Sequence, residues 1–310
     1  MKWIVLFLAL PAQTVCAGLA RYSSLVAADP AGASAQHDAI RVTYLGTNGY
    51  QFESEGQALL VDPYFSRLNF TRVVLGGHVQ PDLQRIDDAM KRLSSKVNVI
   101  VVTHGHIDHL LDAPVIIRKT GARLVASRTA VELVTRAGAP AAHCDAITAG
   151  KTRRVGRWKI TALQATHDRV FPVGVPFAGE PKGTGAPRTA ADWVCGEPLS
   201  YLIETHGHRI FIDSGGTPSL LPPALGRIDL GILGVALPDS RARFSQAVRR
   251  LRPRFVLPSH QDDFFRPLKA GFSFGSFTNF PRVLRDHDSE RLPGRLILLD
   301  YFRPWTLPAE

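Results

Sequence analysis

The segment 103–109, which reads THGHIDH, constrains this chain more than any other stretch. It follows residues 97–102, an apolar run rich in β-branched side chains that predicts a buried strand. Imidazole and carboxylate groups gathered at the end of a strand favour a divalent metal such as zinc. We expect Gly105 to let the backbone turn tightly between the first two imidazoles. The candidate ligands are His104, His106, Asp108 and His109.

Three later side chains of the same types also follow apolar runs. The runs are residues 158–166, 209–212 and 254–259, and the side chains after them are His167, Asp213 and His260. Four strand ends that each deliver a candidate ligand form a far more specific pattern than the first motif alone. The sequence therefore predicts a metal centre built from seven side chains.

At these residues the chain resembles the metallo-β-lactamase superfamily, whose signature is H-x-H-x-D-H followed by a later His, Asp and His. The resemblance covers about residues 40–300. It implies an α/β fold, a four-layer αβ/βα sandwich of two ββα halves with the metal site at their shared edge. Residues 42–49 and 59–63 also resemble the branch that contains ascorbate-phosphate lactonases and N-acylphosphatidylethanolamine-hydrolysing phospholipases.

The resemblance also implies the assignment of ligands to two ions, zinc in the first place, with manganese or iron as alternatives. His104, His106 and His167 would hold one ion, Asp108, His109 and His260 the other, and Asp213 would bridge them. Two such ions lower the pKa of a shared water, and the resulting hydroxide attacks the substrate. Asp108 and Asp213 are the implied catalytic carboxylates. True β-lactamases lack an Asp at the position of Asp213, so β-lactam hydrolysis is not expected.

The leading hypothesis for function is a zinc-dependent hydrolase of a phosphodiester, with lipid-like substrates included. The motif, the aromatic loops described below and a formal net charge of +10 motivate it, since excess positive charge attracts anionic partners. A lactonase or other carboxylic-ester hydrolase would use the same site. An iron-dependent oxidoreductase of the same superfamily and a metal-binding domain without catalysis are the further alternatives.

The expected partner is a small anionic or lipid-like molecule. The chain contains no single basic run of the kind that marks a nucleic-acid-binding tail, so we expect no nucleic-acid partner. Peripheral association with a membrane stays open, and the oligomeric state is not predicted.

The N-terminus predicts export. Residues 1–17 combine a charged start, a short apolar stretch and a small-residue cleavage site, as secretory signal peptides do. We therefore expect a secreted or periplasmic protein, with an uncleaved N-terminal membrane anchor as the alternative. Residues 18–38 are rich in Ala, Ser and Gly and predict a flexible segment. Residues 39–310 are expected to form one hydrolase domain.

Alternating and periodic apolar patterns predict the regular elements. Residues 40–45, 50–53 and 58–61 predict a three-strand meander. Further strands are expected at 97–102, 123–126, 144–147, 152–155, 158–163, 199–204, 209–212, 230–233, 255–258 and 295–299. Helices are expected at 82–93, 112–120, 128–136 and 241–251.

Three long loops flank the candidate ligands, at residues 62–81, 168–198 and 262–281, and all are rich in aromatic side chains. We interpret 168–198 as an insertion, or lid, over the metal site. The aromatic side chains either pack against each other as a small core or line an apolar cleft that leads to the metals. The cleft interpretation predicts a preference for acyl chains. Its candidate substrate contacts are Tyr64, Phe65, Trp193 and Phe264.

The remaining histidines, acids and cysteines have weaker patterns. His206 and His208 repeat the start of the motif but lack the Asp-His that follows it, so we expect neither to bind metal. His78, His143 and His287 are expected to be surface or hydrogen-bonded histidines. Asp168, Asp262 and Asp263 adjoin ligands and either orient imidazoles or face solvent. Cys144 and Cys195 either form a disulfide in an oxidising compartment or stay unpaired.

Overall fold

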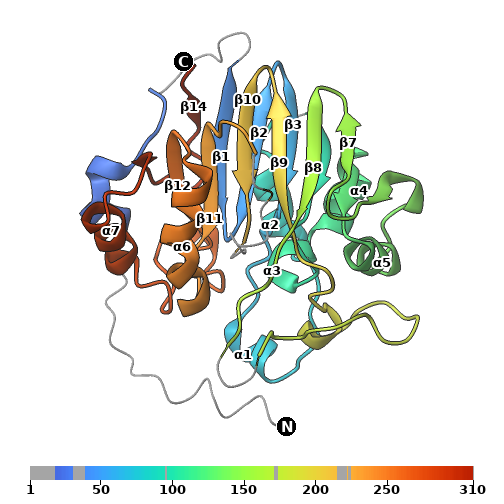
Figure 1. The fold of residues 1–310 in the computed structure, drawn as a ribbon. Coiled ribbons are helices and arrows are strands. Elements are labelled where there is room, and N and C mark those ends of the chain that lie inside the picture. Colours follow the sequence, from blue (N-terminus) through green and yellow to red (C-terminus); the bar gives the residue numbers. More distant parts are fainter. Residues whose placement is uncertain are drawn as a thin grey trace.

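Two seven-stranded sheets pack face to face at the centre of the structure (Figure 1). It is a computed structural model that describes residues 18–30, 39–94, 96–170, 174–214, 222 and 225–309. The first sheet has the order β14-β1-β2-β3-β4-β5-β6, and the second has the order β13-β12-β11-β10-β9-β8-β7. The strands are β1 Ile40–Gly46, β2 Gly49–Ser54, β3 Gln57–Val61, β4 Val97–Val101, β5 Arg123–Ala126, β6 Cys144–Ala146, β7 Thr152–Val155, β8 Trp158–Gln164, β9 Leu199–Thr205, β10 His208–Ile212, β11 Leu230–Gly234, β12 Phe255–Ser259, β13 Arg295–Leu296 and β14 Trp305–Leu307.

The two sheets repeat one pattern of strand pairing. In the first sheet β1, β2 and β3 pair antiparallel, and β3 to β6 then pair parallel. In the second sheet β7 to β10 pair antiparallel, and β10 to β13 pair parallel. β14 adds to the edge of the first sheet beside β1. The two similar halves that the resemblance implied are therefore confirmed.

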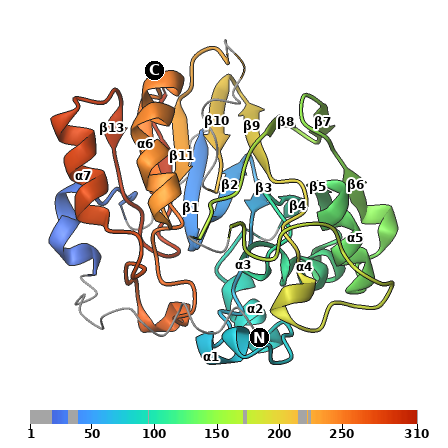
Figure 2. The same cartoon turned by 60° about the horizontal axis from the view of Figure 1, so that its bottom comes forward.

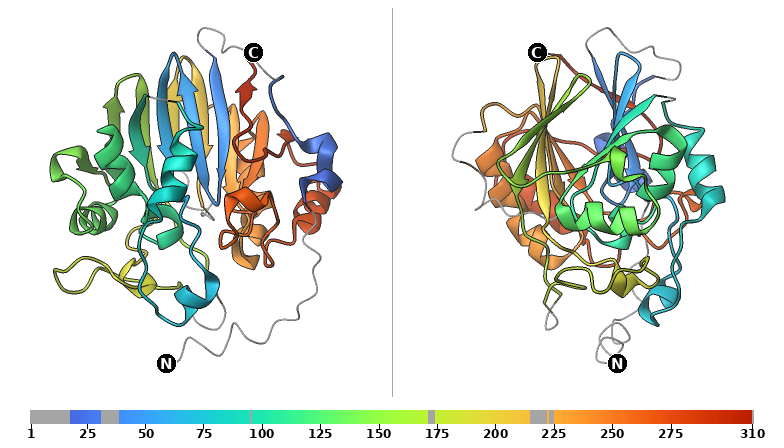
Figure 3. Two further views of the ribbon diagram at one scale, coloured as in Figure 1. Left: turned by 180° about the vertical axis from the view of Figure 1, so that it is seen from behind. Right: turned by 90° about the vertical axis from the view of Figure 1, so that its right-hand side faces the viewer.

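Helices cover the outer face of each sheet, which completes four layers (Figure 3). Helices α2, α4 and α5 pack on the first sheet, and α6 and α7 pack on the second. The α-helices are α1 Phe70–Val74, α2 Leu83–Met90, α3 Ile107–Leu110, α4 Ala113–Thr120, α5 Arg128–Arg136, α6 Pro238–Leu251 and α7 Phe280–Ser289. Short 3-10 helices are η1 Leu19–Leu25, η2 Ala141–His143, η3 Ala190–Asp192 and η5 Leu268–Ala270.

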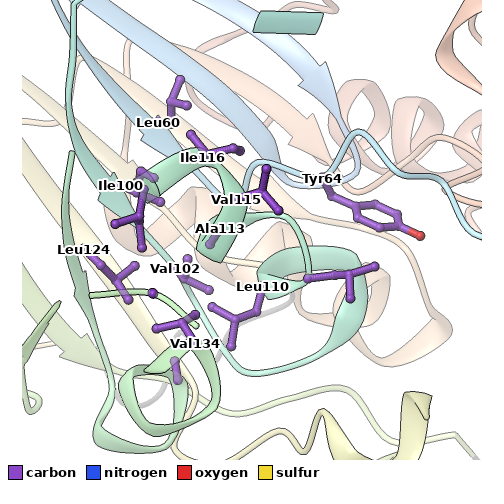
Figure 4. Packing of buried hydrophobic residues seen from close by; sticks show 14 of the residues in the cluster. Leu60, Tyr64, Ile100, Val102, Leu110, Ala113, Val115, Ile116, Leu124 and Val134 are labelled. Carbon is purple, nitrogen blue, oxygen red and sulfur yellow. The ribbon is translucent and has the colours of Figure 1, made fainter. Parts of the chain in front are cut away.

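The central strands are apolar on both faces because both faces are covered. Val99 and Val101 of β4 point into the layer between the sheets, while Ile100 and Val102 pack against the helices. Figure 4 shows Ile100 and Val102 beside Val115 and the other labelled side chains of this outer cluster. Each such side chain contributes about 1.5–3 kcal/mol by leaving water. A continuous apolar run, rather than an alternating one, is what this burial requires.

Most predicted elements are confirmed, with boundaries that differ by a few residues. The loop expected at 62–81 contains α1, and the loop expected at 262–281 ends in the first turn of α7. Asn279 adopts a positive φ of 45° directly before α7, and a proline occupies the first turn of that helix. The left-handed residue and the proline mark the start of α7 within a few residues. A search for helical spacing of apolar residues therefore misses this helix start.

The N-terminal segment corrects one prediction. Residues 18–30 are ordered, and only residues 31–38 of the expected flexible stretch lie outside the described residues. Leu19 and Tyr22 of η1 are buried in the cluster beneath α6 and α7. The Ala27 N–H donates to the Leu298 carbonyl over 2.8 Å. Two apolar side chains and this backbone pairing outweigh the small-residue composition that predicted flexibility.

The predicted signal peptide and the alternative membrane anchor, residues 1–17, lie outside the described residues. Within the described part of the chain, no helix has the length and apolar character needed to cross a bilayer. Of the two alternatives for Cys144 and Cys195, the structure shows the unpaired one, because both are free thiols. Cys144 begins β6 at the edge of the first sheet, whereas Cys195 is buried beside the metal-binding segment.

A buried ion pair connects loop 62–69 to the end of β12. Arg67 Nη1 donates to Asp262 Oδ2 over 2.8 Å, and both side chains are fully buried. Asp262 also accepts from Thr47 N at 2.8 Å and from Tyr301 Oη at 2.5 Å. The guanidinium lies so close to Gly46 that a side chain there would overlap it. The cost of desolvation offsets much of the attraction within such a pair, but the loss of one partner leaves an unpaired buried charge, which is strongly destabilising.

Replacing Arg67 with Met should therefore lower the free energy of unfolding by about 3–5 kcal/mol, because the Asp262 carboxylate stays buried without its cation. Urea denaturation of the purified protein measures this loss. Lys91→Met is the control, since Lys91 forms only an exposed pair with Asp88 at 3.5 Å and should cost about 1 kcal/mol or less. Equal losses in the two variants would contradict the assignment.

Candidate metal centre

Six of the seven predicted ligands meet where the two sheets share an edge. The first sheet supplies four, two shortly after β4 and two in the short helix α3, which lies at the lower strand ends in Figure 1. The second sheet supplies two, beyond the ends of β8 and β12. In chain order they are His104, His106, Asp108, His109, His167 and His260.

These six side chains form two groups of three. In each group, one nitrogen or oxygen from every member lies within 4.8 Å of the others. The first group is His104, His106 and His167, and the second is Asp108, His109 and His260. These are the two ligand triads that the resemblance implied.

The atoms that face each other in the triads are lone-pair donors. His104 Nε2 lies 3.0 Å from His106 Nδ1. In the second triad, Asp108 Oδ2 lies 3.0 Å from His260 Nε2 and 3.3 Å from His109 Nε2. Most of these side chains are nearly inaccessible to water, with 1% of His104 and of His109 exposed. Bringing several buried lone pairs together in this way costs free energy unless a cation binds between them.

Hydrogen bonds hold the opposite side of four imidazoles. His106 Nε2 donates to the Pro176 carbonyl at 2.9 Å, and His167 Nδ1 donates to the Asp168 carbonyl at 2.7 Å. His104 Nδ1 lies 3.1 Å from Thr103 Oγ1. His109 Nδ1 donates to Asp62 Oδ2 at 2.8 Å. A proton on the outer nitrogen leaves the inner nitrogen as a lone pair, which is the tautomer that a metal needs.

Burial and neighbouring charges keep the first triad neutral. Burial lowers the pKa of His104, and the surrounding imidazoles lower it further. For the same reasons the pKa of His106 falls to about 3 and that of His167 to about 4. These rings therefore carry no proton on their inner nitrogens at neutral pH. Neutral imidazoles are the form in which His binds a metal.

The second triad carries opposite charges. Burial disfavours the charged form of Asp108, but His109 and His260 outweigh it and hold the pKa of that carboxyl well below its usual range. Burial likewise opposes a charged His109, but the carboxylates of Asp108 and Asp62 raise its pKa to about 10. The carboxylates thus attract positive charge to this position, which a divalent cation also provides.

The seventh predicted ligand, Asp213, is not a member of either triad within the described residues. It follows β10 and is 5% exposed, and its Oδ1 accepts from Gly234 N over 3.4 Å. The neighbouring Ser214 Oγ lies 3.4 Å from His104 Nδ1. The chain thus passes beside the first triad at this point, and the bridging role of Asp213 stays a prediction.

Comparison with known proteins decides the family. Residues 57–260, well over half of the chain, match the family model described as the beta-lactamase superfamily domain. The chain belongs to the beta-lactamase superfamily. A UPF0173 metal-dependent hydrolase of Anaeromyxobacter dehalogenans is 29% identical over 254 residues, which cover 77% of this chain and 81% of the relative.

Solved structures of low sequence identity share the fold of this superfamily member. The metallo-beta-lactamase fold protein YhfI from Bacillus subtilis superposes with a TM-score of 0.56 at 16% identity, over 87% of this chain and 99% of that protein. The diiron beta-hydroxylase CmlA from Streptomyces venezuelae gives a TM-score of 0.54 at 13% identity, over 89% of this chain and 55% of that protein. The four-layer αβ/βα sandwich is therefore confirmed.

Asp62 is a site residue of this superfamily protein that sequence reasoning missed. It follows β3, has a positive φ of 41° and is fully buried. Besides the bond from His109, its carboxylate accepts from Thr103 N at 2.7 Å, Thr103 Oγ1 at 2.6 Å and Asn48 Nδ2 at 2.8 Å. One carboxylate thus orients a ligand and the backbone that leads to the others. Its signal in the sequence was an acid directly after an apolar strand, as at Asp213.

Gly105 is required for a reason other than the predicted tight turn. Its φ is not in the left-handed region, but a Cβ there would lie 2.1 Å from the Val194 carbonyl oxygen. Gly105 N donates to the Cys195 carbonyl at 3.0 Å. The later part of segment 168–198 therefore packs directly on the metal-binding segment, and its Pro176 carbonyl holds His106.

Three of the four predicted substrate contacts are buried in the core, and their contact with substrate stays a prediction. Tyr64 and Phe65 lie in the core, with 0% and 1% of their surface exposed, and Trp193 is 2% exposed in the same cluster. Only Phe264 contacts a candidate ligand, with its ring 5.3 Å from that of His260. Phe177, which was not singled out, packs 6.2 Å from the His106 ring. Phe171 lies outside the described residues.

Part of the last aromatic loop forms a small core, one of the two predicted alternatives. Phe274 stacks on Phe280 at 4.8 Å and meets Phe272 edge-on at 4.9 Å. Tyr22 of the N-terminal segment packs on Phe274 and Phe280. These rings therefore bury one another rather than line a cleft.

His206, in the second His-Gly-His, is not a member of either triad within the described residues. His206 occupies the turn between β9 and β10, where its Nε2 lies 2.9 Å from Arg157 Nη1. His208 also belongs to neither triad, and His143 Nδ1 donates to the Gly121 carbonyl at 2.9 Å.

The acids that adjoin ligands do not orient imidazoles through their carboxylates. Asp168 pairs with Arg243 at 2.5 Å, and only its backbone carbonyl contacts His167. The carboxylate of Asp262 binds Arg67, and that of Asp263 accepts from Phe265 N at 3.1 Å.

Replacing Asp62 with Asn should weaken binding of the second metal ion by about 10–100-fold, because His109 loses its charged acceptor. Competition with a chelator of known affinity measures the two metal affinities. Asp112→Asn is the matched control: that carboxylate is equally buried and accepts from Phe65 N and Ser66 N, but it contacts no candidate ligand. The same loss of metal affinity in both variants would refute the orienting role of Asp62.

Replacing Gly105 with Ala should reduce the metal content of both sites, because the new Cβ forces apart the metal-binding segment and residue 194. Metal per protein after purification is the measurement. Gly185→Ala is the control, because Gly185 lies in segment 168–198, as residue 194 does, and a Cβ there meets no atom within 4 Å. This variant should have the metal content of the unchanged protein. Unchanged metal content in Gly105→Ala would show that the close approach is dispensable.

Proposed function

We propose that this metal-dependent hydrolase of the beta-lactamase superfamily binds two zinc ions and cleaves phosphodiesters. The observation that carries the proposal is the pair of triads, in which every member except His167 is buried and the donor atoms lie within 4.8 Å of one another. Imidazole and carboxylate donors in groups of three match a catalytic zinc site, which keeps a further position open. The outer hydrogen bonds of the imidazoles support this fit, since they are the bonds that metal-binding histidines make.

Two zinc ions at these positions would lower the pKa of a shared water and so provide a hydroxide near neutral pH. The chain's own residues have separate tasks. The three imidazoles of the first triad bring no charge, whereas Asp108 brings a negative charge to the second. Asp62 fixes the ring of His109. We propose Asp213 as the seventh ligand, since it follows β10 beside Ser214 and His104.

The substrate class rests on charge and on the surroundings of the triads. The formal net charge of +10 favours an anionic substrate. Paired metal ions suit phosphodiesters because they stabilise both the attacking and the leaving oxygen. Phe177 packs on His106 of the first triad, and Phe264 packs on His260 of the second. These two rings support an apolar substituent on the ester. A lactone would use the same residues, so the test below includes that class.

Turnover of bis(p-nitrophenyl) phosphate by the zinc-loaded protein tests the proposal beside a panel of lactones. We expect phosphodiester turnover that Asp108→Ala reduces by about 100-fold or more, since the second triad loses its only carboxylate. His206→Ala removes an imidazole outside both triads and should retain full activity. Turnover of lactones alone, or activity that requires iron instead of zinc, would overturn it.

A further inference from the structure

A cavity of about 840 Å³ lies beside the metal centre, and no candidate metal ligand lines it. Its walls are residues 66–69 and 78–83, parts of α4, residues 186–187 and two aromatic side chains, Trp193 and Phe265. Residues of α1 and of α2 both line it, and Figure 2 shows α1 at this end of the molecule. The volume falls in the range of about 300–1,000 Å³ that is usual for small-molecule sites.

The charge of the cavity is strongly positive. Four arginines line it, and the only acid among its lining residues is Asp82. Arg67 pairs with Asp262, and Arg85 pairs with Asp82 over 3.2 Å. Within the described residues, the other two arginines have no carboxylate partner. Arg118 donates only to the carbonyls of residues 137 and 138, and Arg72 is exposed at the rim. Two positive charges therefore remain for an anion.

The floor of the same cavity is apolar. Val79, Leu111, Val115 and Trp193 line it, and each is at most 4% exposed. Leu83 lines it at the mouth with 57% of its surface exposed. An inorganic anion would leave Leu83 uncovered above this floor, while a neutral hydrocarbon would leave Arg72 and Arg118 without an anionic partner. A cavity with a cationic rim and an apolar floor matches a molecule that has both parts.

We propose that this cavity binds an amphipathic organic anion, with a phosphate or carboxylate head at Arg72 and Arg118 and a hydrocarbon chain against Val79, Leu111 and Trp193. The head groups share one chemistry, because guanidinium groups bind both oxyanions through charge-assisted hydrogen bonds. The site shares a wall with the metal centre: Phe265 packs on Phe264 at 4.2 Å, and Phe264 packs on His260. The inference does not rest on the proposed hydrolase activity.

Isothermal titration of the metal-loaded protein with dodecyl phosphate and with dodecanoate, both below their micelle concentrations, tests the proposal. The double variant Arg72→Gln/Arg118→Gln should bind the preferred probe about tenfold more weakly or worse, since two charged donors are lost. The control Arg153→Gln/Arg154→Gln removes the same charge from exposed β7 residues and should bind like the unchanged protein. Equal affinity in the two double variants would place the probe elsewhere, such as at the metals, and overturn the site.

Two further probes test the need for both parts of the ligand. Dodecanol lacks the charge and inorganic phosphate lacks the chain, so each should bind about tenfold more weakly than dodecyl phosphate. Inorganic phosphate that bound as tightly as dodecyl phosphate would contradict the apolar half of the proposal. Because these experiments measure binding without turnover, an inactive phosphodiesterase would not change their result.

Discussion

The carboxylate of Asp62 is the interaction on which the metal centre depends. It accepts four hydrogen bonds in a fully buried position, from Asn48, from the backbone and side chain of Thr103, and from His109. The four bonds join Asp62 to three parts of the first half: the β1–β2 turn, the end of β4 and helix α3. A buried charge is tolerated only when such donors satisfy it, so the fold around Asp62 and the direction of the ligands are set together.

The second sheet and the segment before β9 complete the metal centre and cover it. The second sheet brings His167 and His260 against the ligands of the first, and the segment before β9 covers Gly105 so closely that no side chain fits there. The Arg67–Asp262 ion pair connects the loop after β3 to the segment that carries His260, because Asp262 lies two residues after that ligand. Burial lowers the pKa of His104, His106 and His167, whereas the carboxylates of Asp108 and Asp62 raise the pKa of His109. The first triad is therefore neutral and the second attracts positive charge, as binding of cations requires.

The sequence predicts those features that depend on neighbouring residues, and it does not predict contacts between residues far apart in the chain. An apolar run such as residues 97–102 predicts a strand because a strand that is buried on both faces needs consecutive apolar side chains. This requirement can be seen within the run alone. The ligands could be found because each follows such a run. The bonds of Asp62, the Pro176 carbonyl on His106 and the approach of Val194 to Gly105 join residues far apart in the chain, and no local pattern encodes them. Aromatic composition likewise did not separate the buried Tyr64 from Phe264 at the site.

Anomalous diffraction at the zinc absorption edge, on crystals of the zinc-loaded protein, tests the central claim most directly. The account predicts two strong peaks in each molecule, one among His104, His106 and His167 and one among Asp108, His109 and His260. A single peak, or peaks outside these triads, would contradict it.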